Sequence, residues 1–253
     1  MKIFRIIILL ALLVFSAFYS KLQRLQSTAW VEPLQLAIYP INADGLVETT
    51  AYINHLNVSN FRSLEVFFNK QWLNYSEFDF QPVAIELMPA IAAKPPEPPQ
   101  SGNVIATMFW SLQLRFWAYQ HSLATDTTTV NVFIQYQQFD EKKALAHSLG
   151  LQKGLIGVVN AYAGRPYQET NNIVIAHELL HTVGASDKYD LQTGQPIYPD
   201  GFAVPSAKYQ QLKAELMAGR VPLSATESEM PRSLRHCMMG DKTAIEIGWI
   251  KIN

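Results

Sequence analysis

Alternation of apolar and polar residues predicts strands at several places in the chain. The clearest case is the segment TTTVNVFIQY at residues 127–136, where every second residue from Val130 to Tyr136 is apolar. A period of two is typical of a half-buried strand, because successive side chains point to opposite faces of a sheet. Weaker forms of the same pattern predict further strands at residues 34–41, 82–91 and 154–163.

Apolar residues at helical spacing predict helices between these strands. Residues 48–72 have this spacing, and we expect Ser59 and Asn60 to divide them into two helices, with Ser59 capping the second. Residues 103–121 are long, aromatic and amphipathic, and we expect a helix of the core there rather than a membrane or partner surface. Shorter helices are expected at residues 206–217 and 243–248.

The first residues of the chain have the pattern of an export signal. Basic residues precede the apolar run IIILLALLVFSAFYS, which begins at residue 6. Bulky residues stand where a cleavage site needs small ones, so we expect residues 1–20 to be an uncleaved signal anchor rather than a cleaved signal peptide. Positive charge before the run favours a domain on the extracytoplasmic side of the membrane; cleavage would make the protein secreted. Residues 21–33 are expected to form a polar tether, and residues 34–253 one domain.

Composition narrows the class of protein. Of the 253 residues, 49% are hydrophobic and 16% are charged, which is enough apolar material for a packed core. The net charge is −1 and no run of Lys or Arg stands out, which argues against nucleic-acid binding, since phosphate contacts require a basic surface. Cys237 is the single cysteine, so an intrachain disulfide is excluded.

The segment HELLHTVGASDKYD, residues 177–190, carries the most specific chemistry. We expect a helix that begins at a cap formed by residues 170–172 and carries the first residues of this segment. His177 and His181 are four residues apart and therefore share one helix face, where two imidazoles can bind one zinc ion. Glu178 is rotated about a quarter turn away and can reach a water bound to that ion.

A third ligand is expected shortly after the helix. Gly184 is well placed to take the left-handed conformation that ends a helix, because glycine adopts it without steric cost. The chain can then turn back and bring Asp187 towards His177 and His181. Two histidines, one aspartate and a water make a four-coordinate zinc site with one open position.

The pattern HExxHxxGxxD resembles the metzincin signature, with Asp187 in place of the usual third histidine. It is similar to snapalysin-like bacterial metzincins, which also have a tyrosine two residues later, here Tyr189. The resemblance implies a zincin-like α/β (α+β) fold. Its upper part, residues 34–184, would hold a mixed twisted sheet and the active-site helix, and its lower part, residues 185–253, would be mainly helical or irregular.

The resemblance also implies a methionine turn beneath the metal. Met217 in the segment ELMAG is the first candidate, although the helical pattern before it argues against a tight turn. The pair Met238 and Met239 is the second candidate, because a possible helix follows it. Plain core packing is the third interpretation, since that is the usual role of methionine.

Together these features predict a zinc-dependent metallopeptidase that acts on a protein or peptide substrate. Glu178 would be the general base, and Tyr189 would either orient Asp187 or donate to the developing oxyanion; the sequence does not choose between these roles. The alternative is a membrane-anchored envelope protein in which the same helix is a structural or degenerate zinc site. Hydrolysis of a non-peptide amide is a third possibility, because the motif specifies the chemistry and not the acyl partner.

Overall fold

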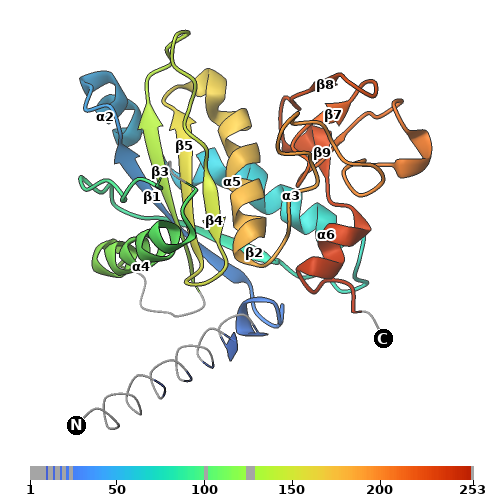
Figure 1. Ribbon diagram of the computed structural model, residues 1–253, viewed down its shortest axis with the longest axis horizontal. Helices are drawn as coiled ribbons and strands as arrows, with labels where there is room; N and C mark the ends of the chain where they lie inside the picture. The colour runs from blue at the N-terminus through green and yellow to red at the C-terminus, as the bar shows by residue number, and fades with distance from the viewer. Residues whose placement is uncertain are drawn as a thin grey trace.

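A five-stranded mixed sheet forms the centre of the computed structural model (Figure 1). The structure describes residues 25–99, 102–123 and 129–251, together with Leu10, Val14, Phe18, Lys21 and Leu22. The strand order is β2-β1-β3-β5-β4; the first four strands are parallel, and β4 runs antiparallel to β5 at one edge. The strands are β1 (Leu34–Asn42), β2 (Val83–Leu87), β3 (Val130–Gln137), β4 (Leu149–Leu151) and β5 (Ile156–Tyr162).

The predicted strands are confirmed, with one addition and one correction. The short edge strand β4 was not expected, because three residues carry no readable alternation. The alternating side chains of β3 from Val130 to Tyr136 all enter one core, as expected. Phe133, on the opposite face of β3, is also fully buried, because a helix covers that side. The strand is therefore buried on both faces rather than half-buried.

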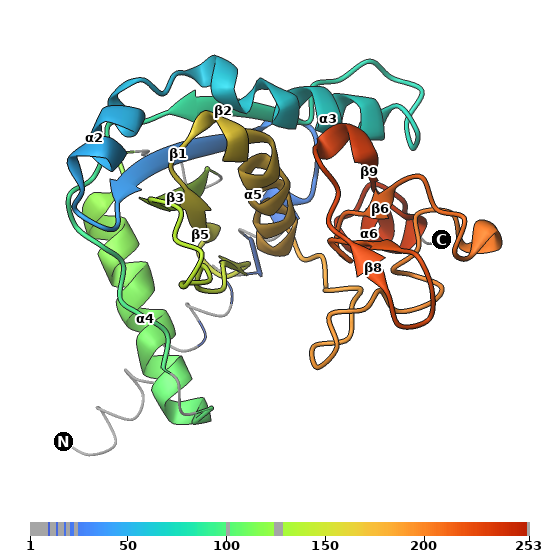
Figure 2. The same cartoon turned by 90° about the horizontal axis from the view of Figure 1, so that it is seen from above.

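Helices cover both faces of this sheet (Figure 2). One face packs against α2 (Val47–Asn54), α3 (Arg62–Trp72) and α5 (Gln168–Thr182), and the other against α4 (Val104–His121). The break expected between the first two helices is present, as the turn of 3₁₀ helix η1 (Val58–Phe61). Its cap is Asn57 rather than Ser59: the Asn57 side chain accepts a hydrogen bond from the main-chain N–H of Ser59 over 3.0 Å.

Helix α4 belongs to the core only along a narrow stripe. Leu114 and Ala118 are its buried residues, and Trp110 and Trp117 pack at the edge of the same cluster. The expectation of a core helix was therefore wrong for most of its surface. Apolar residues surround the helix, and one stripe alone can face the sheet. The large apolar side chains that remain exposed are Val104, Ile105, Met108, Phe109, Leu112, Phe116 and Tyr119.

The C-terminal part, from residue 185 onwards, consists of loops and short elements beside α5 (Figure 1). The helix expected at residues 206–217 is wrong: the 3₁₀ turn η3 (Pro205–Ala207) is followed by bends and then by a strand. The helix expected at residues 243–248 is present as α6 (Asp241–Glu246). The remaining short elements are β6 (Ala214–Glu215), β7 (Val221–Pro222), β8 (Ser228–Glu229), β9 (Cys237–Met238), η2 (Arg165–Tyr167) and η4 (Leu234–His236).

The expected N-terminal anchor, residues 1–20, lies outside the described residues except at three positions. In the described part of the chain, no helix is both long and apolar enough to cross a membrane. Trp30, in the expected tether, is buried: its indole N–H donates to the carbonyl oxygen of Ile247 over 2.7 Å, and its ring meets that of Trp249 edge-on. The end of the tether is therefore part of the folded domain.

Candidate metal centre

Helix α5 presents the two histidines from the face that looks towards the C-terminal part. The helix begins at Gln168, directly after η2, and not at a cap formed by residues 170–172. Asn171 and Asn172 instead use their side chains for tertiary bonds. The amide of Asn171 donates to the carbonyl oxygen of Tyr162, and that of Asn172 to the carbonyl oxygen of Asn60, both over 2.9 Å. These bonds attach the first turns of α5 to the sheet and to η1.

The chain turns back directly after the helix. Gly184 has φ +105°, a conformation that favours glycine, and a Cβ atom there would lie 2.7 Å from Nε2 of Gln152. The main-chain N–H of Ala185 donates to the carbonyl oxygen of Leu180 over 3.0 Å, which closes the turn. The turn expected at Gly184 is therefore present, and it directs the following residues towards the histidines.

His177, His181 and Asp187 converge on one point. Nε2 of His177 lies 3.0 Å from Nε2 of His181, and Oδ1 of Asp187 lies 3.1 Å from each of these nitrogens. The Asp187 side chain is 31% exposed and the histidines less, so the group opens to solvent on one side. In the described part of the chain, this is the group of His, Cys, Asp or Glu side chains whose atoms could hold a metal ion.

The hydrogen bonds of the other ring nitrogens determine which atoms face this point. Nδ1 of His177 lies 3.0 Å from the carbonyl oxygen of Leu216, and Nδ1 of His181 lies 2.8 Å from that of Ala185. A carbonyl oxygen accepts only, so each Nδ1 carries the hydrogen, and each neutral ring turns the lone pair of Nε2 to the centre. Two lone pairs and a carboxylate oxygen at this separation stabilise a cation between them, either a proton or a metal ion.

The donor set fits a zinc ion. Ligand atoms in a tetrahedral zinc site with bonds of about 2.0–2.2 Å lie about 3.3–3.6 Å apart. The three atoms here, at 3.0–3.1 Å, form a slightly smaller triangle, which a small outward shift of the side chains would bring to that size. Two imidazoles fixed by main-chain carbonyl groups are also the arrangement in which zinc-binding histidines are usually held.

Electrostatics at the cluster favours positive charge. Burial works against the charged form of His177, but the hydrogen bond to Asp187 and the charge of Glu178 outweigh it and raise the pKa of His177. Burial likewise opposes ionisation of Asp187, yet hydrogen bonds from the protonated forms of the two histidines would hold its pKa below the ordinary range. Both shifts have the same physical cause: a carboxylate lies where a proton or a metal ion is stabilised.

Glu178 lies beside the three candidate ligands and is buried, with 6% of its surface exposed. Its Oε2 atom is buried without a hydrogen-bond partner among the described residues. Burial raises the pKa of Glu178, and positive charge on His177 and His181 acts in the opposite direction. A buried carboxylate oxygen without a partner is costly in a folded protein, so its position next to a metal-binding group indicates a functional role.

Tyr189 lies at the side of the cluster, with its ring centre 6.4 Å from that of His177. Burial raises the pKa of Tyr189, and the negative charges of Asp187 and Glu178 raise it further. The phenol therefore stays protonated and able to donate a hydrogen bond. These facts agree with either role expected for it.

Met217 lies in a tight turn below His177. The main-chain N–H of Gly219 donates to the carbonyl oxygen of Glu215 over 3.0 Å, and Met217 between them is fully buried. The neighbouring residue Leu216 supplies the carbonyl oxygen that His177 contacts. The carbonyl oxygen of Met217 accepts from the N–H of Lys188 over 2.9 Å. The helical pattern before Met217 argued against a tight turn, and the structure removes that objection.

Met238 and Met239, the second candidate for the methionine turn, lie one strand further from the histidines than Met217. Met238 is in β9, opposite Glu215 in β6. Met239 is fully buried, and its main-chain N–H donates to the side chain of Gln71 over 2.9 Å. The carbonyl oxygen of Met238 accepts from the N–H of Leu216 over 2.8 Å, so Met238 supports the turn around Met217, whereas Met239 joins the same segment to α3.

Sequence reasoning missed two charged residues that hold this site in place. Glu215 is fully buried and accepts hydrogen bonds from Thr243 (2.7 Å), Ala218 (3.0 Å) and Gly240 (3.2 Å). Lys188 is also buried, and its ammonium group lies 2.6 Å from the carboxylate of Glu246, which accepts from the N–H of Ser186 as well. Glu215 fixes the turn of Met217, and Lys188 fixes the loop of Asp187. The partners lie far apart in sequence, so no local pattern could have found them.

Gly150 in the edge strand β4 was also missed. A Cβ atom at this position would lie 2.3 Å from the carbonyl oxygen of Glu178 and 2.6 Å from Cβ of His181. The strand therefore lies directly against α5 at the level of the metal-binding group.

No known protein-family model matches this chain, and no curated protein matches it significantly. Function is therefore inferred from the residues of the site.

Proposed function

We propose that this protein is a zinc-dependent metallopeptidase, similar to metzincins in which an aspartate is the third ligand. The observation that carries the proposal is the convergence of Nε2 of His177, Nε2 of His181 and Oδ1 of Asp187 within 3.0–3.1 Å of one another. The sequence resemblance leads to the same three residues independently of that geometry.

A bound zinc ion supplies a Lewis acid, which polarises the scissile carbonyl group and makes a water molecule more acidic. Glu178 takes the proton of the attacking water and passes it to the leaving amine. Burial raises the pKa of Glu178, which makes its carboxylate a stronger base than that of an exposed glutamate. Tyr189 keeps its proton and donates either to Asp187 or to the oxyanion.

The charge of the ligand set makes proton removal from the water depend more on Glu178. Two neutral histidines and one aspartate carry one negative charge, whereas three histidines carry none. The water is therefore less acidic than in a three-histidine site, so removing its proton depends more on the general base. On this proposal the substrate is a protein or peptide on the extracytoplasmic side, and residues 1–20 attach the enzyme to the membrane.

The test is cleavage of a proteome-derived peptide library by purified full-length protein, wild type against Glu178→Gln, with the zinc content of both measured. We expect cleavage by the wild type and a rate at least about 100-fold lower for the variant at equal zinc content. Glu48→Gln, which removes an exposed carboxylate from α2, is the matched control and should cleave normally. Full activity of zinc-loaded Glu178→Gln would refute the general-base role. A zinc-loaded wild type without turnover on any peptide would favour the scaffold alternative.

A further inference from the structure

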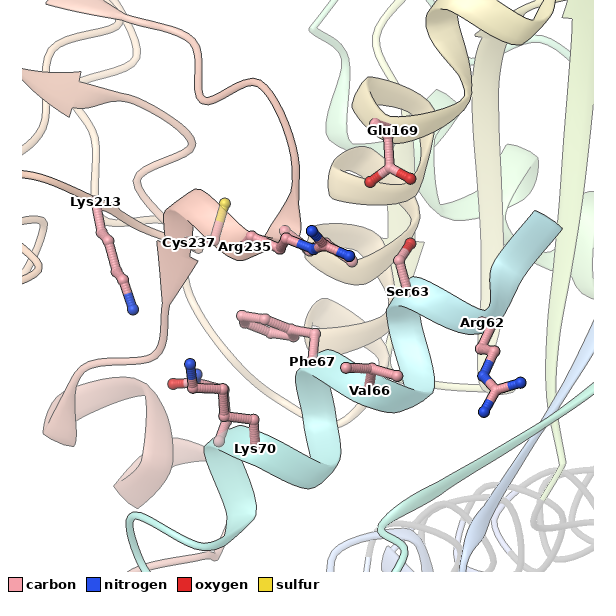
Figure 3. Close-up of a pocket in the computed structure, with 11 residues that line it drawn as sticks. Arg62, Ser63, Val66, Phe67, Lys70, Glu169, Lys213, Arg235 and Cys237 are labelled. Carbon is pink, nitrogen blue, oxygen red and sulfur yellow. The ribbon is translucent and has the colours of Figure 1, made fainter. Parts of the chain in front are cut away.

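A second candidate site lies apart from the metal centre. A cavity of about 550 Å³ opens between α3, the start of α5 and the C-terminal part (Figure 3). None of the candidate metal ligands lines it. Its volume is within the range of about 300–1,000 Å³ that is usual for small-molecule sites.

The cavity is strongly positive, although the chain as a whole is not. Four of the residues that line it are cations and one is an anion, Glu169, which leaves a local excess of about three positive charges, whereas the whole chain has a net charge of −1. Within the described part of the chain, none of the four cations forms an ion pair. The four are Arg62, Lys70, Lys213 and Arg235.

These charges come from two parts of the chain: Arg62 and Lys70 lie on α3, and Lys213 and Arg235 lie in the C-terminal part. Arg235 extends from η4 towards Ser63 and Glu169, and Lys213 approaches from the opposite side (Figure 3). Like charges gathered without partners repel one another, at a cost that a bound anion would remove. Arg62, Lys70 and Arg235 are exposed, so their unpaired positive charge is accessible to an anion that enters the cavity.

The remaining lining residues indicate what kind of anion fits. Val66, which is 57% exposed, and the edges of the nearly buried Phe67 and Leu234 give the cavity apolar surface, which free phosphate or sulfate could not use. The guanidinium group of Arg235 can bind a phosphate or carboxylate through two hydrogen bonds. A phosphate monoester carries nearly two negative charges at neutral pH and a carboxylate only one, so the excess of positive charge favours the phosphate.

We propose that this cavity binds an organic phosphate monoester. Arg235 binds the phosphate group, Lys213 adds positive charge from another side of the cavity, and the organic part lies against Val66 and the edge of Phe67. Glu169 at the rim accepts a hydrogen bond from a hydroxyl or amino group of the ligand. This proposal does not depend on the metallopeptidase activity.

Isothermal titration calorimetry of the full-length protein with phenyl phosphate is the direct test, because this probe has both a phosphate group and an apolar ring. We expect saturable binding at one site per chain, and weaker binding of inorganic phosphate at the same ionic strength. Arg235→Gln and Lys213→Gln should each weaken phenyl phosphate binding about tenfold, the effect of losing one hydrogen bond to a charged group. Lys142→Gln, which removes an exposed charge outside the cavity, should bind like the wild type.

The outcomes separate the parts of the proposal. Absence of saturable binding to the wild type, or unchanged binding to the Arg235→Gln/Lys213→Gln double variant, would overturn the site. Inorganic phosphate that binds as tightly as phenyl phosphate would overturn the role of the apolar wall. Arg235→Glu, compared with the wild type by circular dichroism, serves as a second variant: a folded protein that still binds phenyl phosphate would also contradict the proposal.

Discussion

The carbonyl oxygen of Leu216 accepts a hydrogen bond from Nδ1 of His177 over 3.0 Å, and so joins the candidate metal centre to the C-terminal part. This contact fixes the tautomer of His177 and aims Nε2 at His181 and Asp187. The next residue, Met217, accepts from the N–H of Lys188, directly after Asp187. One short turn therefore supports two of the three candidate ligands, and residues that support this turn should affect metal binding.

Replacement of Glu215 tests that dependence. Glu215→Ala leaves the N–H of Gly240 and the hydroxyl of Thr243 without their acceptor, whereas the N–H of Ala218 keeps the main-chain carbonyl oxygen of residue 215. We expect a loss of about 3 kcal/mol in the free energy of unfolding, measured by urea denaturation, and weaker zinc binding. Glu215→Gln keeps the size of the side chain and one acceptor oxygen, so its loss should be smaller. Equal stability of wild type and Glu215→Ala would show that the turn does not need this carboxylate.

Gly150 offers a test of the packing between β4 and α5. Gly150→Ala puts a methyl group 2.3 Å from the carbonyl oxygen of Glu178, which must displace either the strand or the helix. We expect a loss of about 1–3 kcal/mol in unfolding free energy and reduced zinc affinity. Gly157 pairs with Gly150 on β5, and a Cβ atom there would lie 3.1 Å from Val132, a much milder contact. Gly157→Ala should therefore cost less, and the reverse order of the two variants would contradict the close approach at Gly150.

The ion pair of Lys188 and Glu246 predicts a pH dependence. Burial opposes ionisation of Glu246, but the hydrogen bond from Lys188 outweighs it and lowers the pKa of Glu246 below its ordinary value of 4.5. A carboxyl group with a lowered pKa in the folded state stabilises the protein above the unfolded pKa, and this stabilisation is lost as the pH falls through the folded pKa. Glu246→Gln should therefore cost about 2 kcal/mol at pH 7, because a buried ammonium group loses its partner.

The difference between wild type and Glu246→Gln isolates this one group. Measured by urea denaturation from pH 7 downwards, the difference should stay constant above pH 4.5 and shrink below it. A difference that did not change with pH in this range would mean that folding does not shift the pKa of Glu246.

The sequence was most informative where the physical signal is local. The period of two from Val130 to Tyr136 predicted β3, and the spacing of His177, His181, Gly184 and Asp187 predicted a cluster that the structure brings together. In each case the relevant residues lie within a few positions of one another. Strand alternation, helix periodicity and the conformational freedom of glycine are properties of such short segments.

The sequence was least informative where distant segments decide the structure. Residues 206–217 have a helical pattern, but Glu215 is held by Gly240 and Thr243, and β6 pairs with β9 instead. Tertiary hydrogen bonds to a buried carboxylate thus outweigh a weak local preference. The cavity between Arg235 and Lys213 was invisible for the same reason, since its charges meet only in the folded chain.

We propose that His177, His181 and Asp187 together hold one zinc ion. Elemental analysis of purified full-length protein, after removal of loosely bound metal, tests it most directly. We predict about one zinc per chain in the wild type and in His55→Ala, which removes an exposed histidine far along the sequence from the cluster, and less than about a tenth of that in His181→Ala. Wild-type protein without zinc, or His181→Ala with as much zinc as the wild type, would contradict the account.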